Sequence, residues 1–188
     1  MESNTIVYLV ILGAVVLLAI WFIGIYNGLV RLRNLVKEAW SQIDVQLKRR
    51  HDLIPNLVET VKGYAGHEKS TLEMVVKARA QAVDSKGVEA QARAEQELTS
   101  ALGKLLVVVE QYPDLKANQN FLALQEELSS TENKIGFSRQ HYNETVMQYN
   151  TRIQTFPPNI IAGMYNFKEE PFFQLEDAKE REVPQVKF

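Results

Sequence analysis

The hydrophobic residues of this chain follow two different patterns, and the first is a single unbroken run. Residues 6–26, IVYLVILGAVVLLAIWFIGIY, contain no charged side chain. In a helix, about 21 residues at roughly 1.5 Å each cross the 30 Å of a bilayer's hydrocarbon core. The run therefore predicts a transmembrane helix. Its anchor residues are Ile6 and the interfacial aromatics Tyr8, Trp21 and Tyr26.

Beyond this run, apolar residues recur at the three- and four-residue spacing of amphipathic helices. The pattern predicts long helices over residues 28–62, 70–83 and 88–112, and a last one that starts between residues 113 and 118 and runs to 156 with near-heptad spacing. The expected breaks are residues 84–87, which end in Gly87, and Pro113. Gly63 and Gly66 are expected to end the first helix, and Ser70 with Glu73 predicts a capping box at the start of the second. No segment alternates as a β-strand does, so the chain is predicted to be all-α.

Pro157 and Pro158 are expected to end the last long helix and to leave a tail over residues 157–188. The first half of this tail is too apolar for a free linker, so it should pack on the bundle, a neighbouring subunit or the membrane surface. The residues predicted to pack are Phe156, Phe167, Phe172 and Phe173. The last dozen residues are charged and are expected to be loosely held.

Charge adds an orientation and excludes one class of partner. Only Glu2 is charged before the apolar run, whereas Arg31, Arg33 and Lys37 follow it closely. The positive-inside rule therefore predicts a single-pass protein of the inner membrane, with its N-terminus outside and its bundle in the cytoplasm. The net charge of −2 argues against nucleic-acid binding, and the absence of cysteine fits a reducing compartment. The lipid bilayer is the partner that the sequence predicts.

One stretch, RRHDLIPNLV at residues 49–58, combines charge with a helix breaker. Pro55 lacks an amide donor and clashes with the carbonyl of His51, which predicts a kink and a polar cluster beside it. The members of this cluster are Arg49, Arg50, His51, Asp52 and Pro55. We interpret it as structural, with a ligand or partner site as the alternative. A catalytic His51–Asp52 pair is disfavoured because adjacent helical residues point about 100° apart.

Other candidate chemistry is sparse. A polar set near the apolar stripe of the last long helix predicts a buried ion-pair or hydrogen-bond network. Its members are Glu132, Asn133, Arg139, Tyr142 and Tyr149. The chain has no Glu-x-x-His, H-E-x-x-H, G-x-S-x-G, phosphate-binding glycine loop or kinase signature. The sequence therefore predicts no catalytic residue, cofactor or metal, and it identifies no small-molecule substrate.

Three long segments carry a family resemblance. They are YNGLVRLRNLVKEAWSQIDVQLKRRHDLIPNLVETVKGYAGHE (26–68), YPDLKANQNFLALQEELSSTENKIGFSRQHYNETVMQYN (112–150) and FPPNIIAGMYNF (156–167). Together they resemble the LemA family, with departures around residues 83–97 and at the charged C-terminus. The resemblance implies a membrane anchor (1–27), an antiparallel up-and-down four-helix bundle with long helices (28–156) and an apolar C-terminal tail (157–188). It implies no reaction, and relatives among magnetosome-membrane proteins hint at membrane organisation.

These features predict a non-enzymatic, membrane-anchored scaffold. It would self-associate as a homo-oligomer and organise or remodel the bacterial inner membrane. The alternative is an envelope sensor or adaptor whose bundle relays a signal to an unknown protein partner through the kink at Pro55. An unrecognised enzyme using His51 or Glu132 is the third hypothesis.

Overall fold

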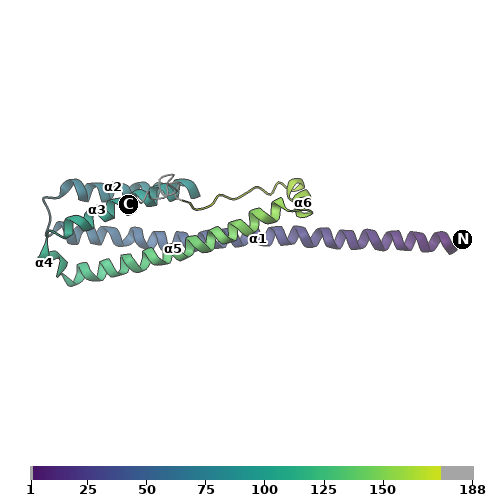
Figure 1. The fold of residues 1–188 in the computed structure, drawn as a ribbon, viewed down its shortest axis with the longest axis horizontal. Coiled ribbons are helices and arrows are strands. Elements are labelled where there is room, and N and C mark those ends of the chain that lie inside the picture. The colour runs from purple at the N-terminus through teal and green to yellow at the C-terminus, as the bar shows by residue number, and fades with distance from the viewer. Residues whose placement is uncertain (1, 175–188) are drawn as a thin grey trace, which may run out of the picture. The chain divides into compact units, whose positions relative to one another are not determined.

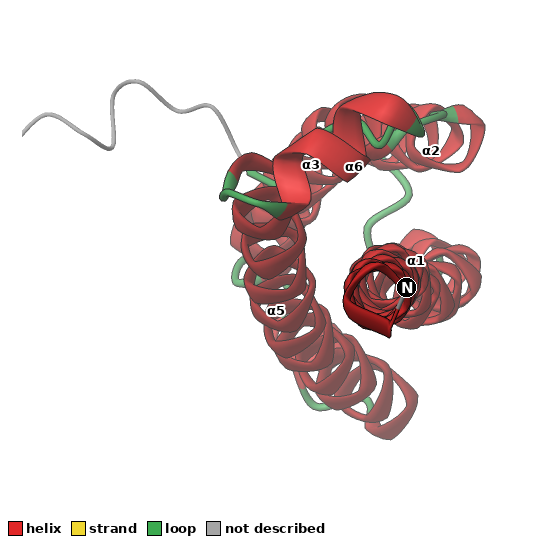
Figure 2. Cartoon of the chain, turned by 90° about the vertical axis from the view of Figure 1, so that its right-hand side faces the viewer, coloured by secondary structure: helices red, strands yellow, loops and turns green. Residues whose placement is uncertain are grey.

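The computed structural model describes residues 2–174, and all regular structure in that range is helical (Figure 2). The helices are α1 (Glu2–Lys62), α2 (Lys69–Asp84), α3 (Val88–Val109), α4 (Pro113–Lys116), α5 (Gln119–Gln154) and α6 (Pro158–Met164) (Figure 1). The predicted all-α class with an apolar N-terminal helix is confirmed. The expectation for the last dozen residues lies outside the described range.

Helix α1 joins the predicted transmembrane segment to the first helix after it without interruption. It runs for 61 residues, continues through Pro55 and ends at Lys62, just before the predicted stop at Gly63. Among the described residues, only α1 is long and apolar enough to cross a membrane, and none of its most apolar window is buried. Such a surface requires an apolar surrounding, because exposed leucine and isoleucine are unfavourable in water.

The chain divides into two compact units, which are described separately. The first comprises residues 1–41 and 140–170, and the second comprises residues 42–139 and 171–188. Helices α1 and α5 each contribute one part to both units. The apolar run of residues 6–26 thus belongs to the first unit, and the RRHDLIPNLV stretch belongs to the second.

In the second unit, α2 and α3 form a helical hairpin around small and aliphatic residues. The predicted break falls at residues 85–87, where Gly87 has a φ of 86° that favours glycine. The predicted capping box is wrong: α2 begins at Lys69, and no side chain caps it. The carbonyl of Glu68 instead accepts the amides of Thr71 and Leu72, which leaves Ser70 inside the first turn.

A short helix, α4, fills the connection between α3 and α5. Helix α3 ends at Val109, and Pro113 opens α4, where its missing amide donor costs nothing. Asn118 then caps α5, because its Oδ1 accepts the amide of Phe121 at 3.0 Å. The predicted start of the last long helix, between residues 113 and 118, is therefore off by one residue.

In the first unit, the segment after α5 folds back onto α5. Helix α6 was not predicted as a helix, and the chain after it runs extended to Glu170. The hydroxyl of Tyr149 donates to the carbonyl of Lys168 at 2.9 Å. The amide side chain of Asn150 both donates to and accepts from the backbone of Glu170, each at 2.9 Å. These bonds fix the post-α6 segment on α5.

The aromatic residues predicted to pack in the tail divide evenly. Phe167 in the first unit and Phe173 in the second are buried, as that prediction requires. Phe156 is 78 % exposed and Phe172 is 37 % exposed, so neither is buried by the chain itself, and for these two packing on a neighbouring subunit or the membrane surface stays a prediction. Phe156 lies in the turn between α5 and α6, where the chain reverses and the side chain points outward.

Candidate functional site

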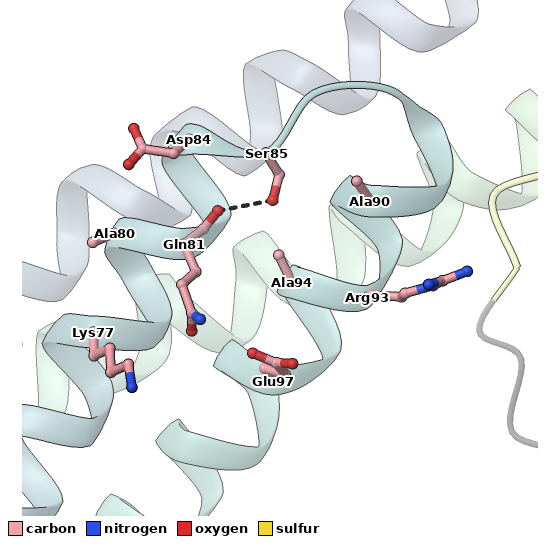
Figure 3. Close-up of a pocket in the computed structure, with 9 residues that line it drawn as sticks. All are labelled: Lys77, Ala80, Gln81, Asp84, Ser85, Ala90, Arg93, Ala94 and Glu97. Atoms are coloured by element: carbon pink, nitrogen blue, oxygen red, sulfur yellow. Dashed lines mark hydrogen bonds between the residues drawn. The ribbon is translucent and has the colours of Figure 1, made fainter.

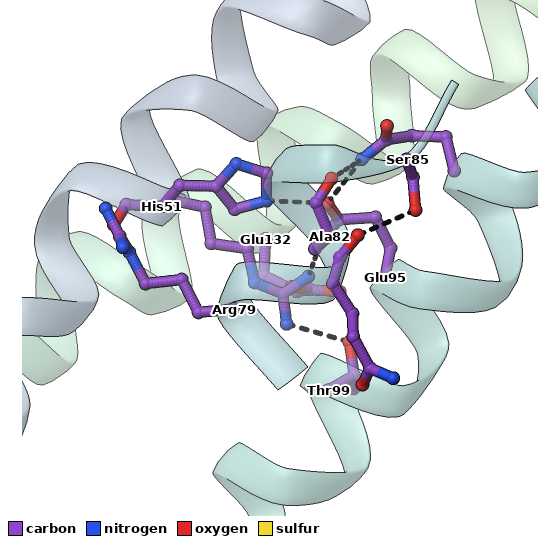
Figure 4. A network of polar contacts seen from close by, with 10 residues as sticks. His51, Arg79, Ala82, Ser85, Glu95, Thr99 and Glu132 are labelled. Atoms are coloured by element: carbon purple, nitrogen blue, oxygen red, sulfur yellow. Dashed lines mark hydrogen bonds and ion pairs between the residues drawn. The ribbon is translucent and has the colours of Figure 1, made fainter. Parts of the chain in front are cut away.

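The most buried polar cluster of the second unit is centred on Glu95 of α3, which is 5 % exposed (Figure 4). Its carboxylate lies 2.7 Å from His51 Nε2, 2.9 Å from Gln91 Nε2 and 3.3 Å from an Arg50 guanidinium nitrogen. The first distance requires that the proton of His51 be on Nε2, so that Nε2–H donates to the carboxylate. A buried carboxylate is tolerated only when it is paired and hydrogen-bonded, and Glu95 meets both conditions.

Arg50 of α1 holds α3 at a second side chain and links this cluster to one further helix, α5. Its guanidinium donates to Thr99 Oγ1 of α3 at 2.7 Å and pairs with Glu132 of α5 at 3.1 Å. The Arg50 side chain is 5 % exposed, whereas that of Glu132 is 48 % exposed. The cluster therefore runs from a dry centre at Glu95 to a wet edge at Glu132, and the dry pair dominates its energetics because solvent screens the outer one.

The backbone effect of Pro55 is resolved by a side chain from another helix. Because proline has no N–H, the carbonyl of His51 four residues earlier loses its helical donor. Arg79 Nε of α2 donates to that carbonyl at 2.7 Å (Figure 4). The region of the predicted kink is thus where α2 docks on α1, and the Arg79 cation satisfies the part-buried carbonyl.

The residues of the predicted RRHDLIPNLV cluster lie in different surroundings. Arg50 and His51 enter the buried cluster, while Arg49 forms a half-exposed pair with Glu127 at 2.7 Å. Asp52 is exposed next to the buried His51, so the two do not share surroundings. Sequence reasoning missed Glu95, Gln91, Thr99 and Arg79. The signal for Glu95 was its spacing of three residues from Ala92 and from Leu98, which places a carboxylate in an apolar stripe.

The predicted network of the last long helix does not form as one unit. Glu132 joins the Glu95 cluster, Asn133 is exposed, and the Arg139 guanidinium lies over the Phe173 ring at 5.5 Å. Tyr142 and Tyr149 belong to the first unit. The members therefore lie in different surroundings, since α5 passes from one unit to the other between Arg139 and Gln140.

The two tyrosines of the first unit are buried beside a carboxylate. Burial, with a further contribution from the charge of Glu170, raises the pKa of Tyr142 to about 12. Burial also raises the pKa of Tyr149, assisted by Glu170 and opposed by Arg33. Both hydroxyls are therefore held protonated, and Tyr142 packs edge-on against Trp40 at 5.5 Å between ring centroids.

A second feature of the second unit is a hollow between α2 and α3, drawn in Figure 3. It is lined mainly by polar and small residues, and Ser85 Oγ within it donates to the carbonyl of Gln81 at 2.8 Å. Within residues 2–174, no group of three or more His, Asp or Glu side chains is placed to hold a metal. The Glu95 cluster, whose donors and acceptors engage one another, is suited to joining helices.

Comparison with known proteins gives consistent matches. The sequence model of the LemA family matches residues 39–188. Protein LemA of Metamycoplasma hominis is 28 % identical over 164 residues, which cover 86 % of this chain and 74 % of that protein. Magnetosome protein MamQ 2 of Paramagnetospirillum magneticum is 26 % identical over 179 residues, which cover 81 % of this chain and 66 % of that protein. Magnetosome protein MamQ of Magnetospirillum gryphiswaldense is 24 % identical over 189 residues, which cover 86 % of this chain and 70 % of that protein. With the apolar α1, these matches indicate a membrane-associated protein.

Proposed function

The chain belongs to the LemA family, and from this premise we propose that it is a non-enzymatic, membrane-anchored helical scaffold. It self-associates and thereby organises or remodels the bacterial inner membrane. Relatives that carry the name magnetosome protein are in keeping with this role. The anchor is the apolar part of α1, and the assembling part is the helical region that follows it.

The second unit supports an antiparallel four-helix bundle as the assembling part. Arg50 of α1 pairs with Glu132 of α5, and Tyr64 just after α1 accepts a bond from Asn118 just before α5. From the first contact to the second, the residue number rises by fourteen on the α1 side, from Arg50 to Tyr64, and falls by fourteen on the α5 side, from Glu132 to Asn118. The two contacts are those of helices that run antiparallel. The short connections at residues 63–68 and 85–87 favour the same alternation for α2 and α3.

The observation that carries self-association is the placement of Phe137. This ring is 74 % exposed near the middle of α5, with the buried Ile135 two residues before it. Two residues span about 200° of a helix, so Phe137 points away from the core that Ile135 faces. A phenyl ring held outward on a rigid helix loses little conformational freedom when it docks, which is the property of an interface anchor.

The same unit offers a receptor for such an anchor on a different surface. A shallow hollow between the end of α1 and α2 is lined by Val58, Leu72 and Val76, together with lysines and glutamates. A ring on one surface and an apolar hollow on another make a heterologous contact, which repeats from copy to copy. Such contacts generate closed rings or open filaments, and either would impose a geometry on the membrane that holds the anchors.

The experiment measures the mass of the full-length protein in mild detergent by light scattering, with electron microscopy for shape. The wild type is expected to form a large assembly. Phe137→Ser and Val76→Lys should each reduce its mass, because the first removes the ring and the second places a charge in the hollow. Met147→Ser, which changes another exposed apolar residue of α5, is the matched control and should leave the mass unchanged.

Two outcomes would count against the scaffold. A monomeric wild-type protein would remove the proposal outright. An assembly that both substitutions leave unchanged would remove the Phe137 contact as its basis. If the double variant Phe137→Ser with Val76→Lys were no worse than either single variant, the two residues would act in the same contact.

The second candidate function is a sensor or adaptor, and the bond from Arg79 to the His51 carbonyl favours it. At Pro55 helix α1 lacks one backbone hydrogen bond, and the Arg79 cation replaces it. Such a contact can form in one state of a bundle and open in another. Pro55→Ala would return the intrahelical donor and compete with Arg79. In this hypothesis the substitution changes the cellular envelope response and leaves the assembly mass intact. Loss of assembly alone would remove its motivation.

A further inference from the structure

Helix α6 carries an apolar surface that the protein itself does not cover. Ile160 and Met164, one turn apart on the same face, are 56 % and 66 % exposed. Ile161 and Ala162, on the other side of the helix, are 2 % and 3 % exposed and fix α6 to the first unit. The helix, PNIIAGM, contains no charged residue. Something other than water is therefore expected to face Ile160 and Met164.

The contacts of α6 place this surface at a defined level along α1. The ring of Tyr165, directly after α6, lies 4.7 Å from the ring of Tyr26 and 6.2 Å from that of Phe22, centroid to centroid. Phe167 lies 5.9 Å from Tyr26. Phe22 and Tyr26 form the last turn of the apolar run. If that run fills the hydrocarbon core, α6 lies at the boundary between acyl chains and headgroups.

Charged residues of the first unit lie beyond the C-terminal end of the apolar run. The backbone of Arg33 lies about 10 Å further along α1 than that of Tyr26, at a rise of about 1.5 Å per residue. The guanidinium of Arg33 stacks on the Phe167 ring at 4.9 Å from the ring centroid. Lys168, Glu169 and Glu170 come next in the chain. The apolar surface of α6 is thus level with the end of the span, and the charged groups lie on the aqueous side, where headgroups and water solvate them.

We propose that α6 is a second membrane contact, lying in the headgroup–acyl boundary of the leaflet at the C-terminal end of the α1 span. Ile160 and Met164 insert beside the anchor, and the exposed Phe156 and Tyr165 flank them. Side chains of interfacial helices enter this zone by about 5–10 Å. The contact fixes the rotation of α1 about its axis, since one side of the helix carries α6. It requires that α1 span the membrane, and it does not require self-association.

The test uses the absence of cysteine from the chain. Met164→Cys and Ile160→Cys, made separately in the full-length protein, are labelled with a polarity-sensitive fluorophore. Each labelled protein is reconstituted into vesicles of phosphatidylethanolamine and phosphatidylglycerol. Met147→Cys is the matched control, because it replaces the same residue type, belongs to the same unit and is 54 % exposed. Lipids spin-labelled near the headgroup or near the chain end then report depth.

Labels at positions 164 and 160 are expected to be quenched about twofold or more by the headgroup-proximal spin label, and less by the deep one, as an interfacial helix requires. The label at position 147 should be quenched by aqueous iodide instead. Equal lipid quenching at positions 164 and 147 would overturn the proposal. Protection from iodide without lipid quenching would also overturn it, by assigning the surface to a second copy of the chain.

Light scattering on the same labelled proteins separates this inference from the proposed scaffold. A monomer whose α6 label meets lipid would overturn the scaffold and support the α6 contact. An assembly whose α6 label is quenched by neither the shallow nor the deep spin label would support the scaffold and overturn the α6 contact. Alkaline extraction of the vesicles verifies in each case that α1 is inserted.

Discussion

Removal of the Glu95 carboxylate tests the energetics of the buried cluster most directly. Glu95→Leu leaves the Arg50 guanidinium, the His51 Nε2–H and the Gln91 amide without their common acceptor. Arg50 keeps Thr99 and the half-exposed Glu132, which soften the loss. Breaking one side of a buried ion pair costs about 3–5 kcal/mol, which corresponds to a fall in Tm of about 6–20 °C in a chain of this size.

The assay is urea unfolding of the full-length protein in mild detergent, followed by circular dichroism and linear extrapolation. Arg50→Met alone should cost a similar amount. The double variant Arg50→Met with Glu95→Leu should be more stable than the sum of the two losses by about 2–3 kcal/mol, because no unpaired charge remains. Arg49→Met is the control, since its pair with Glu127 is half exposed and worth at most about 1 kcal/mol.

The reasoning would be refuted by either of two results. If Glu95→Leu cost no more than Arg49→Met, burial of the carboxylate would not matter to stability. If the double variant were as unstable as the sum of the single ones, Arg50 and Glu95 would not be coupled.

Three further predictions concern the first unit and the orientation of the chain. The free energy of unfolding should fall by roughly 2–3 kcal/mol between pH 10 and 12, because the unfolded chain ionises Tyr142 near pH 10.0 and the folded one holds its proton to about 12; urea titrations at several pH values measure this loss, and Tyr142→Phe should flatten it. Asn150→Ala should accelerate hydrogen exchange of the Glu170 amide and cost about 1–3 kcal/mol, because the part-buried backbone of Glu170 loses both hydrogen-bond partners. The exposed Gln154→Ala is its control. A fluorescent protein fused after Phe188 should be active and alkaline phosphatase at the same point inactive, and the opposite pattern would reverse the predicted orientation.

The sequence allowed the helices to be placed closely but not their caps. Apolar spacing located α1, α2, α3 and α5 because a helix that buries one face must repeat that face every three to four residues. Gly87 and the Pro113 region marked breaks for equally local reasons. The capping box at Ser70 failed because the turn before α2 placed Glu68 at the N-cap, and α6 was overlooked because seven residues hold too little periodicity to detect.

The site was predictable only on one side. The stretch RRHDLIPNLV is recognisable from the sequence because it combines charged residues with a proline inside a helical pattern. The loss of the hydrogen bond to the His51 carbonyl follows from the chemistry of proline alone. Its partners Glu95 and Arg79 lie 44 and 28 residues from His51 in the chain, respectively. A single sequence does not show which faces of distant helices pack together, so identifying these partners required the structure.

The sequence by itself determined that the chain has an apolar N-terminal helix, that most of the described residues after it are helical, and that a backbone hydrogen bond is missing at Pro55. Each is a property of neighbouring residues: length of an apolar run, helical periodicity, a missing amide. Only the tertiary structure decided that Glu95 pairs with Arg50, that Phe137 faces outward, and that Tyr165, directly after α6, lies against Phe22 and Tyr26. These depend on packing between segments far apart in the chain, where small differences in the fit of side chains choose the partner.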